Sequence, residues 1–344
     1  MLDHGRPTSV EPFVRGIAWP AGNGAAYPRA DPADAGRLPN DTWGAATLPV
    51  GVRLEIAGDA VAVEIAYSTA TEQLGYRGVG VGTTFTAWRA GACIDEQPAV
   101  LGDGIVRIRL RPTEAERSGD TAERTIVYLP EGMRPLVTAL TGSGGTITPP
   151  ARQPRWLAYG DSIAEGWIAS GPAGSWPAIA GRAFGLDTIN LGYAGSARGE
   201  IASAQQIAML VDIDVISISH GTNCWTRIPH SVAQMQANSS AFLRIVRDGH
   251  PGVPIVVASP IVRPDGEAVA NVLGATHAGI RAAMEHAVRS QIDSGDSLLT
   301  LVPGANVVDA ALLADGVHPG DDGHKVLADV FGCAVAAALS SRPG

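Results

Sequence analysis

Residues 155–167 read RWLAYGDSIAEGW, and this stretch decides the fold of the second half of the chain. Residues 156–159 are an apolar run of strand length that leads directly into Gly160-Asp161-Ser162. The residues after Ser162 favour a helix, so the serine is expected between the carboxyl end of a strand and the N-terminus of a helix. Backbone N–H groups at such a junction can stabilise a developing negative charge. The alternative interpretation is a serine that only caps the helix.

The alternation of short apolar runs with helical patterns continues from this stretch to the end of the chain. The predicted strands are Arg155–Tyr159, Thr188–Leu191, Val215–Ser219, Ile255–Ser259 and Asn306–Val308. The predicted helices are Trp176–Phe184, Ala202–Leu210, Val232–Arg247, Thr276–Ser290 and Asp321–Leu339. Alternating strands and helices imply a parallel sheet with helices on both faces. Such a sheet has its functional sites at the carboxyl ends of its strands.

The part of the chain before residue 150 follows a different pattern. Short β runs with turn signals between them occur at residues 52–56, 61–67, 106–110 and 125–129. No long amphipathic helix appears in this part, so a β-sandwich or jelly roll is predicted. The first 40 residues are rich in Pro, Gly and Ala, which favours an extended arm.

A turn-rich segment, TGSGGTITPP at residues 141–150, is the expected join between two domains. The predicted organisation is therefore an N-terminal arm over 1–40, a β-sandwich over 41–150 and an α/β domain over 151–344.

The composition excludes several classes of protein. The chain is 45% hydrophobic and 17% charged, with 42 Gly and 24 Pro, which indicates a folded chain with many turns. The net charge of −9 and the lack of clustered Lys and Arg argue against nucleic-acid binding. The three cysteines, Cys93, Cys224 and Cys333, have neither metal-site spacing nor the even number of a disulfide framework.

The sequence pattern predicts neither a signal peptide nor a membrane span. Residues 1–20 carry charges and no long apolar core, so no signal peptide is predicted. No run of about 18 apolar residues is seen, so no membrane span is predicted. A cytoplasmic location is the expectation, with secretion left open if a leader precedes this sequence.

Two further blocks follow predicted strands. Residues 190–195 read NLGYAG, in which glycines allow close backbone approach and Gly195 can present an unobstructed N–H. Residues 219–223 read SHGTN, in which the Asn223 amide is a neutral donor suited to an anion. The alternatives are an ordinary turn for the first block and a turn-capping Asn for the second.

The last block, DGVHP at residues 315–319, pairs an acid with a histidine. An Asp three residues before a His on one loop can hold the imidazole by its Nδ1–H and leave Nε2 to accept a proton. Asp321 and His324 repeat this spacing, but His324 falls on the predicted closing helix and is discounted. The alternative for Asp315 and His318 is a solvated loop pair.

Together these four blocks resemble the SGNH (GDSL-like) hydrolases. The matching pattern is Gly-Asp-Ser, Asn-x-Gly-x-x-Gly, Gly-x-Asn and Asp-x-x-His, in this order, over about residues 155–340. The stretches YGDSIAEGW and DGVHPGDDGH are very close to it. The resemblance implies a flavodoxin-like parallel sheet between helices. The β-rich part resembles, more weakly, the sandwich domains that some relatives carry ahead of the catalytic domain.

The resemblance also implies roles for five residues. Ser162 would be the nucleophile, His318 the base and Asp315 the group that orients it. The backbone N–H groups of Ser162 and Gly195 and the side chain of Asn223 would form the oxyanion hole. Many relatives have Asp after the third-block Asn, where this chain has Cys224, and this puts a local hydrogen bond in doubt. Cys224 as nucleophile and His220 as a catalytic group are both disfavoured against structural roles.

The expected function is that of a serine esterase acting by acyl-enzyme chemistry on a small-molecule ester. By resemblance the acyl group is small, with acetyl the first candidate, on a carbohydrate or small metabolite. No metal or organic cofactor is expected. The alternatives are an acyltransferase using the same residues and a non-catalytic carbohydrate-binding protein, which the filled catalytic positions disfavour.

Overall fold

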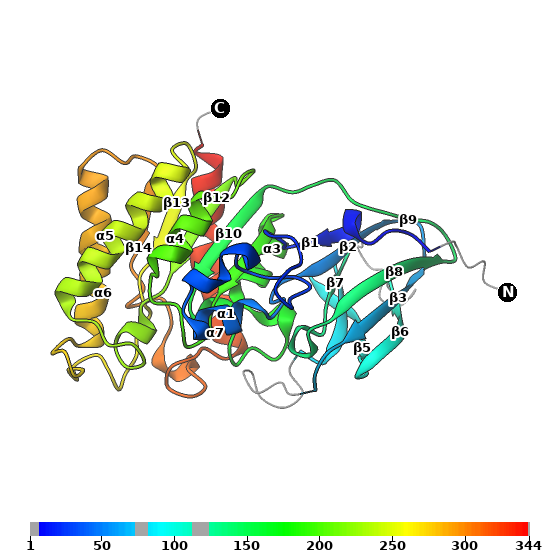
Figure 1. The fold of residues 1–344 in the computed structure, drawn as a ribbon, viewed down its shortest axis with the longest axis horizontal. Helices are drawn as coiled ribbons and strands as arrows, with labels where there is room; N and C mark the ends of the chain where they lie inside the picture. Colours follow the sequence, from blue (N-terminus) through cyan, green and yellow to red (C-terminus); the bar gives the residue numbers. More distant parts are fainter. Residues whose placement is uncertain (1–6, 73–81, 112–123, 343–344) are drawn as a thin grey trace.

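The structure is a computed structural model that describes residues 7–72, 82–111 and 124–342. Residues 1–6, which belong to the expected arm and to the segment searched for a leader, lie outside the described residues. So do residues 73–81 and 112–123 of the expected β-sandwich. Figure 1 shows two parts side by side, one of helices around a sheet and one composed mainly of strands.

A five-stranded parallel sheet forms the centre of the C-terminal part. Its strands are β10 (Arg155–Gly160), β11 (Asp187–Gly192), β12 (Val215–Ser219), β13 (Ile255–Ala258) and β14 (Leu299–Val302). The strand order is β11-β10-β12-β13-β14, and every neighbouring pair is parallel. This is the predicted flavodoxin-like order, in which the chain reverses direction across the sheet beside β10.

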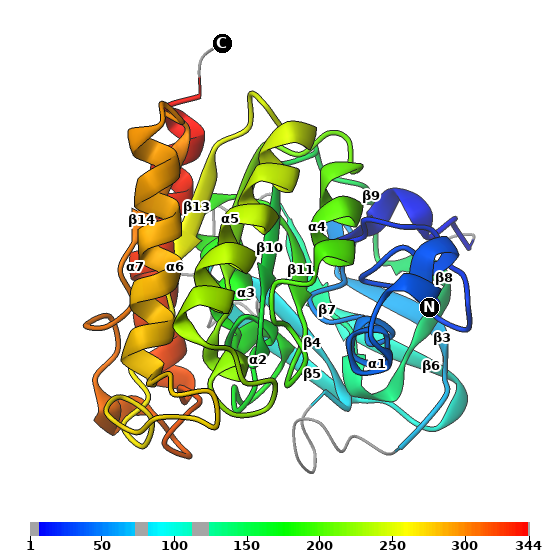
Figure 2. The ribbon, with the colours of Figure 1, turned by 60° about the vertical axis from the view of Figure 1, so that its left-hand side comes forward.

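Helices cover both faces of the sheet, as the fold requires. On one face α4 (Ile201–Ala208), α5 (Val232–Gly249) and α6 (His277–Asp293) share a buried apolar cluster with Leu157 and Ile216. On the other face α3 (Trp176–Phe184) and α7 (Asp321–Ser340) share a second cluster with Trp156 and Val215. Figure 2 shows α4, α5 and α6 in front of the strands. Successive strand residues thus enter opposite cores, which explains the continuous apolar runs.

Helix α7 has the length and hydropathy of a membrane span, contrary to the expectation that no segment has them. It is the one such helix among the residues that the structure describes. Leu327, Phe331 and Val335, spaced four residues apart, are buried in the cluster that contains Trp156 and Trp176. This packing against the sheet accounts for the apolar stripe of the helix.

The prediction of a strand at Asn306–Val308 is wrong. The fifth strand is β14, and residues 305–308 form a turn in which the Val307 N–H donates to the Gly304 carbonyl. A Cβ at Gly304 would lie 2.1 Å from the Ser259 carbonyl oxygen. After β14 the backbone therefore packs closely against the residue that follows β13. Val308 is buried by packing in the α7 cluster, not by strand pairing. A short apolar run does not distinguish these two origins of burial.

The β-rich part is a sandwich of two antiparallel sheets. The larger has the order β1-β2-β7-β4-β5, with β9 paired to β2, and the smaller has the order β6-β3-β8. The strands are β1 (Val14–Arg15), β2 (Arg53–Gly58), β3 (Ala62–Thr69), β4 (Thr84–Arg89), β5 (Ala92–Pro98), β6 (Gly102–Arg109), β7 (Thr125–Tyr128), β8 (Leu136–Ser143) and β9 (Ile147–Thr148). Inward-facing residues of both sheets form one apolar core. The predicted sandwich is therefore present.

Strand β2 joins the two parts through buried charges. The Arg53 guanidinium lies 3.0 Å from Asp187 and 2.9 Å from Glu55, and it donates to the Thr188 carbonyl at 3.0 Å. Burial opposes the charge of Arg53, but Glu55 and Asp187 raise its pKa above the ordinary value. The polar face of β2 is thus an interface with β11, the edge strand of the parallel sheet.

The segment expected as an extended arm is packed against both parts. It contains η1 (Glu11–Phe13), β1, η2 (Pro32–Arg37) and the start of α1 (Asn40–Ala46). Phe13 and Tyr27 are buried in the sandwich core, whereas Ala30 and Leu38 are buried with α4 and α5. The blue segment of Figure 2 follows this course. The domain boundaries at residues 40 and 150 stay predictions.

Candidate active site

Ser162 begins α2 (Ser162–Glu165), directly after β10, as predicted. The Asp161 carboxylate caps this short helix by accepting the Ile163 N–H at 3.1 Å. Gly160 is required at the turn because a Cβ there would lie 2.5 Å from the Ala164 side chain. The turn leaves Ser162 only 5% exposed, at the floor of an open cavity.

His318 and Asp315 lie beside Ser162 in one chain of hydrogen bonds. The Ser162 Oγ is 2.8 Å from His318 Nε2, and His318 Nδ1 is 2.7 Å from Asp315 Oδ2. The other carboxylate oxygen, Asp315 Oδ1, accepts the backbone N–H groups of Val317 at 2.9 Å and His318 at 2.7 Å. The imidazole is therefore held with Nε2 toward the serine hydroxyl, the arrangement that a serine nucleophile needs.

The environment keeps Asp315 ionised. Partial burial acts to raise its pKa, but the hydrogen bonds from His318 and Val317 outweigh this effect and lower the pKa below the ordinary value. Burial raises the pKa of Asp161 to about 6, despite bonds from the backbone of Ile163 and Thr222. Of these two carboxyl groups near His318, Asp315 thus holds its charge over the wider pH range.

The two other predicted blocks reach the same cavity. Gly195 lies on the turn after β11 with φ of +70°, and Asn223 lies in η6 (Thr222–Cys224) after β12. The Asn223 Nδ2 donates to the Ala197 carbonyl at 3.1 Å, which fixes the amide and leaves its second N–H for another acceptor. Ser162, His318, Gly195 and Asn223 all line a cavity of about 630 Å³. The structure thus brings every predicted site residue together, with Asp315 behind His318.

The second block is shaped by its Asn and Gly residues. The Asn190 side chain donates to the Ala164 carbonyl at 2.8 Å and accepts the Gly192 N–H at 2.8 Å. A Cβ at Gly192 would lie 2.3 Å from the Glu165 nitrogen. Only glycine therefore lets β11 end this close to α2, and this contact sets the position of the turn that carries Gly195.

A buried ion pair that the sequence pattern does not reveal supports this turn. Arg29, from the N-terminal segment, lies 3.2 Å from Glu165, and both side chains are almost fully buried. Arg29 also donates to the Gly192 carbonyl, and Glu165 accepts the Ala194 N–H at 3.0 Å. Glu165 stood inside the quoted YGDSIAEGW stretch, but nothing in the local pattern links it to Arg29.

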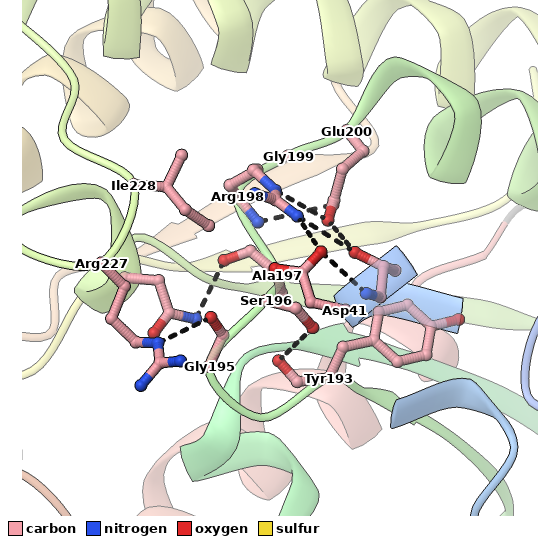
Figure 3. Close-up of polar contacts among 12 residues, drawn as sticks. Asp41, Tyr193, Gly195, Ser196, Ala197, Arg198, Gly199, Glu200, Arg227 and Ile228 are labelled. Atoms are coloured by element: carbon pink, nitrogen blue, oxygen red, sulfur yellow. Dashed lines mark hydrogen bonds and ion pairs between the residues drawn. The ribbon is translucent and has the colours of Figure 1, made fainter. Parts of the chain in front are cut away.

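A second missed network centres on Glu200, beyond the same turn. Its carboxylate accepts the Tyr159 hydroxyl at 2.7 Å and the Thr42 hydroxyl at 2.7 Å, and it lies 3.3 Å from Arg198. Figure 3 shows Glu200, Arg198 and Asp41 grouped at one end of the 193–200 loop, with Gly195 at the other. Burial and the neighbouring Glu200 raise the pKa of Tyr159 well above its usual value, so its hydroxyl stays a donor. Helix α1 thereby helps to hold the loop.

The three side chains that were disfavoured as catalytic groups, His324, His220 and Cys224, are buried in the fold. His324 is buried on α7, where its ring contacts the Trp176 N–H and the Trp167 carbonyl, each at 3.3 Å. His220 is buried against Tyr159 and Phe242, and burial lowers its pKa to about 3, which keeps it neutral. Cys224 is a buried free thiol whose pKa burial raises.

Metal ligands are not gathered at this site. Within residues 7–72, 82–111 and 124–342, no three His, Cys, Asp or Glu side chains are grouped to hold a metal ion. The polar side chains that line the cavity are hydroxyls, an imidazole, an amide, guanidinium groups and the two carboxylates of Asp41 and Glu165.

Replacing Asn223 with alanine is expected to lower kcat by roughly 10²–10³-fold with little change in KM. The amide would donate to the substrate only when charge develops in the transition state. The measurement is steady-state hydrolysis of 4-nitrophenyl acetate, with thermal unfolding as a check because the Ala197 carbonyl loses its partner. Cys224→Ser is the control, since it alters the neighbour and keeps the donor. A large KM effect with normal kcat would mean that Asn223 binds ground-state substrate instead.

The doubly covered parallel sheet with a Ser–His–Asp chain at its carboxyl edge defines a class, the carboxylic ester hydrolases of the SGNH type. Residues 158–326 match the family described as GDSL-like lipase/acylhydrolase, and the chain belongs to that family through this domain. The comparison with curated proteins gave no match.

Solved structures share the fold over the whole chain. A salicylyl-acyltransferase from a tetracycline biosynthetic pathway is 22% identical, with a TM-score of 0.80, over 98% of each chain. A GDSL-like lipase from Bacteroides ovatus is 19% identical, with a TM-score of 0.76, over 99% of this chain and 98% of that one. An acetyl xylan esterase from the rumen bacterium Butyrivibrio proteoclasticus is 13% identical, with a TM-score of 0.61, over 97% of this chain and 99% of that one. At these identities the likeness establishes the fold, including that of the β-rich part.

Proposed function

We propose that the protein is a serine esterase that removes a small acyl group, with acetyl the first candidate, from a carbohydrate or another small metabolite. The observation that carries this proposal is the Ser162–His318–Asp315 hydrogen-bond chain, with distances of 2.8 and 2.7 Å, at the floor of an open cavity. A nucleophile, a base and an orienting carboxylate in this order are the parts that acyl transfer requires.

The proposed reaction has two steps. His318 Nε2 accepts the Ser162 proton as Oγ attacks the ester carbonyl, and the imidazolium then donates this proton to the leaving alcohol. In the second step water loses a proton to His318 and attacks the acyl-enzyme. The imidazolium then returns this proton to Ser162 Oγ as the ester bond to the enzyme breaks and the acid is released. In both steps the oxyanion would receive the N–H groups of Ser162 and Gly195 and the amide of Asn223.

The size of the cavity supports a substrate larger than a simple acetyl ester. At about 630 Å³ it lies within the range of small-molecule sites and exceeds the volume of an acetyl group. A short acyl group at Ser162 would leave most of the cavity to the alcohol. The acetyl xylan esterase and the family two carbohydrate esterases with this fold are named for acetylated or carbohydrate substrates, which favours a sugar alcohol.

An acyltransferase is the second candidate, because the salicylyl-acyltransferase shares the fold at 98% coverage of both chains. The same serine, histidine and aspartate would serve, with an acceptor alcohol in place of water. A carbohydrate-binding protein without activity is disfavoured, because such a protein has no need of the hydrogen-bond chain to Ser162.

The test is a series of 4-nitrophenyl esters of increasing acyl length, alongside acetylated sugars, with and without added alcohols. We expect the acetyl ester to be cleaved fastest and acid release to equal nitrophenol release. Acylated alcohol forming at the expense of acid would establish the acyltransferase. Folded protein that cleaves none of these esters would refute the proposed activity.

A further inference from the structure

Arginines gather around the cavity that contains Ser162. Arg134, Arg227 and Arg263 all line it, although the chain as a whole carries a net charge of −9. The only carboxylates among the described residues that line it are Asp41 and Glu165.

Each of these carboxylates has an arginine partner that does not line the cavity. Asp41 lies 2.6 Å from Arg198, and Glu165 lies 3.2 Å from the buried Arg29. Arg263 likewise has a partner, since its guanidinium lies 3.0 Å from Asp265 and stacks on the Trp225 ring. Arg134 and Arg227 are thus the arginines lining the cavity that have no acidic partner among the described residues.

Arg227 is held in place without an acidic partner. Its Nε donates to the Gly195 carbonyl at 3.1 Å, and Figure 3 shows this contact at the turn that carries Gly195. Among the described residues no carboxylate forms an ion pair with it, so its terminal N–H groups keep their capacity to bind an anion. The contact to Gly195 places them beside the expected oxyanion hole.

Arg134 comes from the other part of the molecule. It follows η4 (Glu131–Met133) in the β-sandwich and adopts the left-handed conformation, with φ of 51° and ψ of 61°. This conformation is unfavourable for a residue with a side chain and is usually taken by glycine. Within the described part of the chain Arg134 forms no ion pair, and its side chain is exposed on the cavity. A strained, unpaired arginine facing a cavity suggests a ligand-binding role.

We propose that the ester substrate carries an anionic group, a carboxylate or a phosphate, which Arg134 and Arg227 bind. Guanidinium groups bind such oxyanions through paired N–H donors. The inference rests on the proposed esterase function and specifies its substrate class. It also gives the β-sandwich a role, because Arg134 would select the substrate from outside the catalytic domain.

The test compares matched anionic and neutral esters. The first pair, 4-acetoxybenzoate and 4-acetoxybenzamide, places the charge on the alcohol. The second pair, the 4-nitrophenyl monoester of adipic acid and its terminal amide, places the charge on the acyl group. We expect kcat/KM to favour the anionic member of one pair by at least about fivefold at low salt, the effect of a charge-assisted hydrogen bond in a partly open site. The pair that shows this preference identifies the portion of the substrate that carries the charge.

Variants then assign the preference to the arginines. Arg134→Gln and Arg227→Gln should each reduce the anionic-to-neutral ratio. Arg134→Lys should retain part of it, because the charge stays and the paired N–H donors are lost. Arg134→Gly removes the charge and also the backbone strain of the left-handed conformation. It should therefore reduce the preference for anionic esters without lowering thermal stability. Arg244→Gln, on the exposed side of α5, is the matched control and should leave the ratio unchanged. Equal rates within both pairs, or a ratio that neither Arg134→Gln nor Arg227→Gln alters, would overturn the proposal.

A binding experiment separates this inference from the proposed activity. In the Ser162→Ala variant, calorimetry should show tighter binding of 4-acetamidobenzoate than of 4-acetamidobenzamide, or of monomethyl adipate than of its terminal amide. Arg134→Gln should reduce the difference. If this preference appears while no ester is cleaved by the wild type, the esterase proposal fails and the anion site stands. Equal binding together with equal rates excludes the anion site.

Discussion

Replacement of Ser162 by alanine is expected to abolish ester hydrolysis, with a loss in kcat of about 10⁴–10⁶-fold. The reason is that Ser162 Oγ is the atom hydrogen-bonded to His318 Nε2 at 2.8 Å, and alanine offers the substrate no nucleophile. The fold should survive, since one hydroxyl beside an open cavity contributes about 1 kcal/mol or less. The measurements are kcat with 4-nitrophenyl acetate and the midpoint of thermal unfolding.

Ser219→Ala is the matched control, because Ser219 also ends a strand of the same sheet and lies outside the hydrogen-bond chain. A serine-directed phosphonate should label the wild type at Ser162, located by mass spectrometry of peptides. Labelling at Cys224 instead would overturn the assignment. The structure argues against that outcome, because the Cys224 thiol is fully buried and its pKa is raised.

The second large effect is expected for His318→Ala, which should also lower kcat by several orders of magnitude, about 10⁴–10⁶-fold. The variant leaves Ser162 without the group that accepts its proton. The matched comparison is His324→Ala, three residues after Asp321 just as His318 is three residues after Asp315. His324 should affect stability more than kcat, because its ring is buried between α7 and the backbone of Trp167 and Trp176.

Steady-state kinetics and thermal unfolding of both histidine variants test this assignment. A fully active His318→Ala enzyme, or a stable and inactive His324→Ala enzyme, would show that the wrong histidine has been assigned as the base. The His324 ring contacts the Trp167 carbonyl, and the Trp167 ring packs on the His318 ring with centroids 5.9 Å apart. Loss of His324 can therefore shift His318 slightly through Trp167, and a small loss in kcat for His324→Ala is compatible with the assignment.

The positions of the candidate site residues could be predicted from the sequence because local chemistry and one topological rule sufficed. Ser162, Gly195 and Asn223 each follow an apolar strand, and parallel strands bring their carboxyl ends to one edge of a sheet. Asp315 and His318 are three residues apart, so their contact needs only a loop. The wrong strand at Asn306–Val308 shows the limit of this reasoning, since a buried turn and a short buried strand have the same apolar pattern.

The support of the site was decided by tertiary structure. Arg29 and Glu165 are 136 residues apart, and Thr42 and Glu200 are 158 residues apart. Polar residues at such separations leave no periodic signal, because their pairing depends on how the N-terminal segment packs across the sheet edge. The same holds for Arg134, which reads as a surface residue after a turn in the β-sandwich. The sequence by itself therefore determined four strands of the parallel sheet and the catalytic candidates, which depend on local pattern. The packing of the two parts decided which distant arginines stabilise the loop and line the cavity, because only the folded chain brings those charges together.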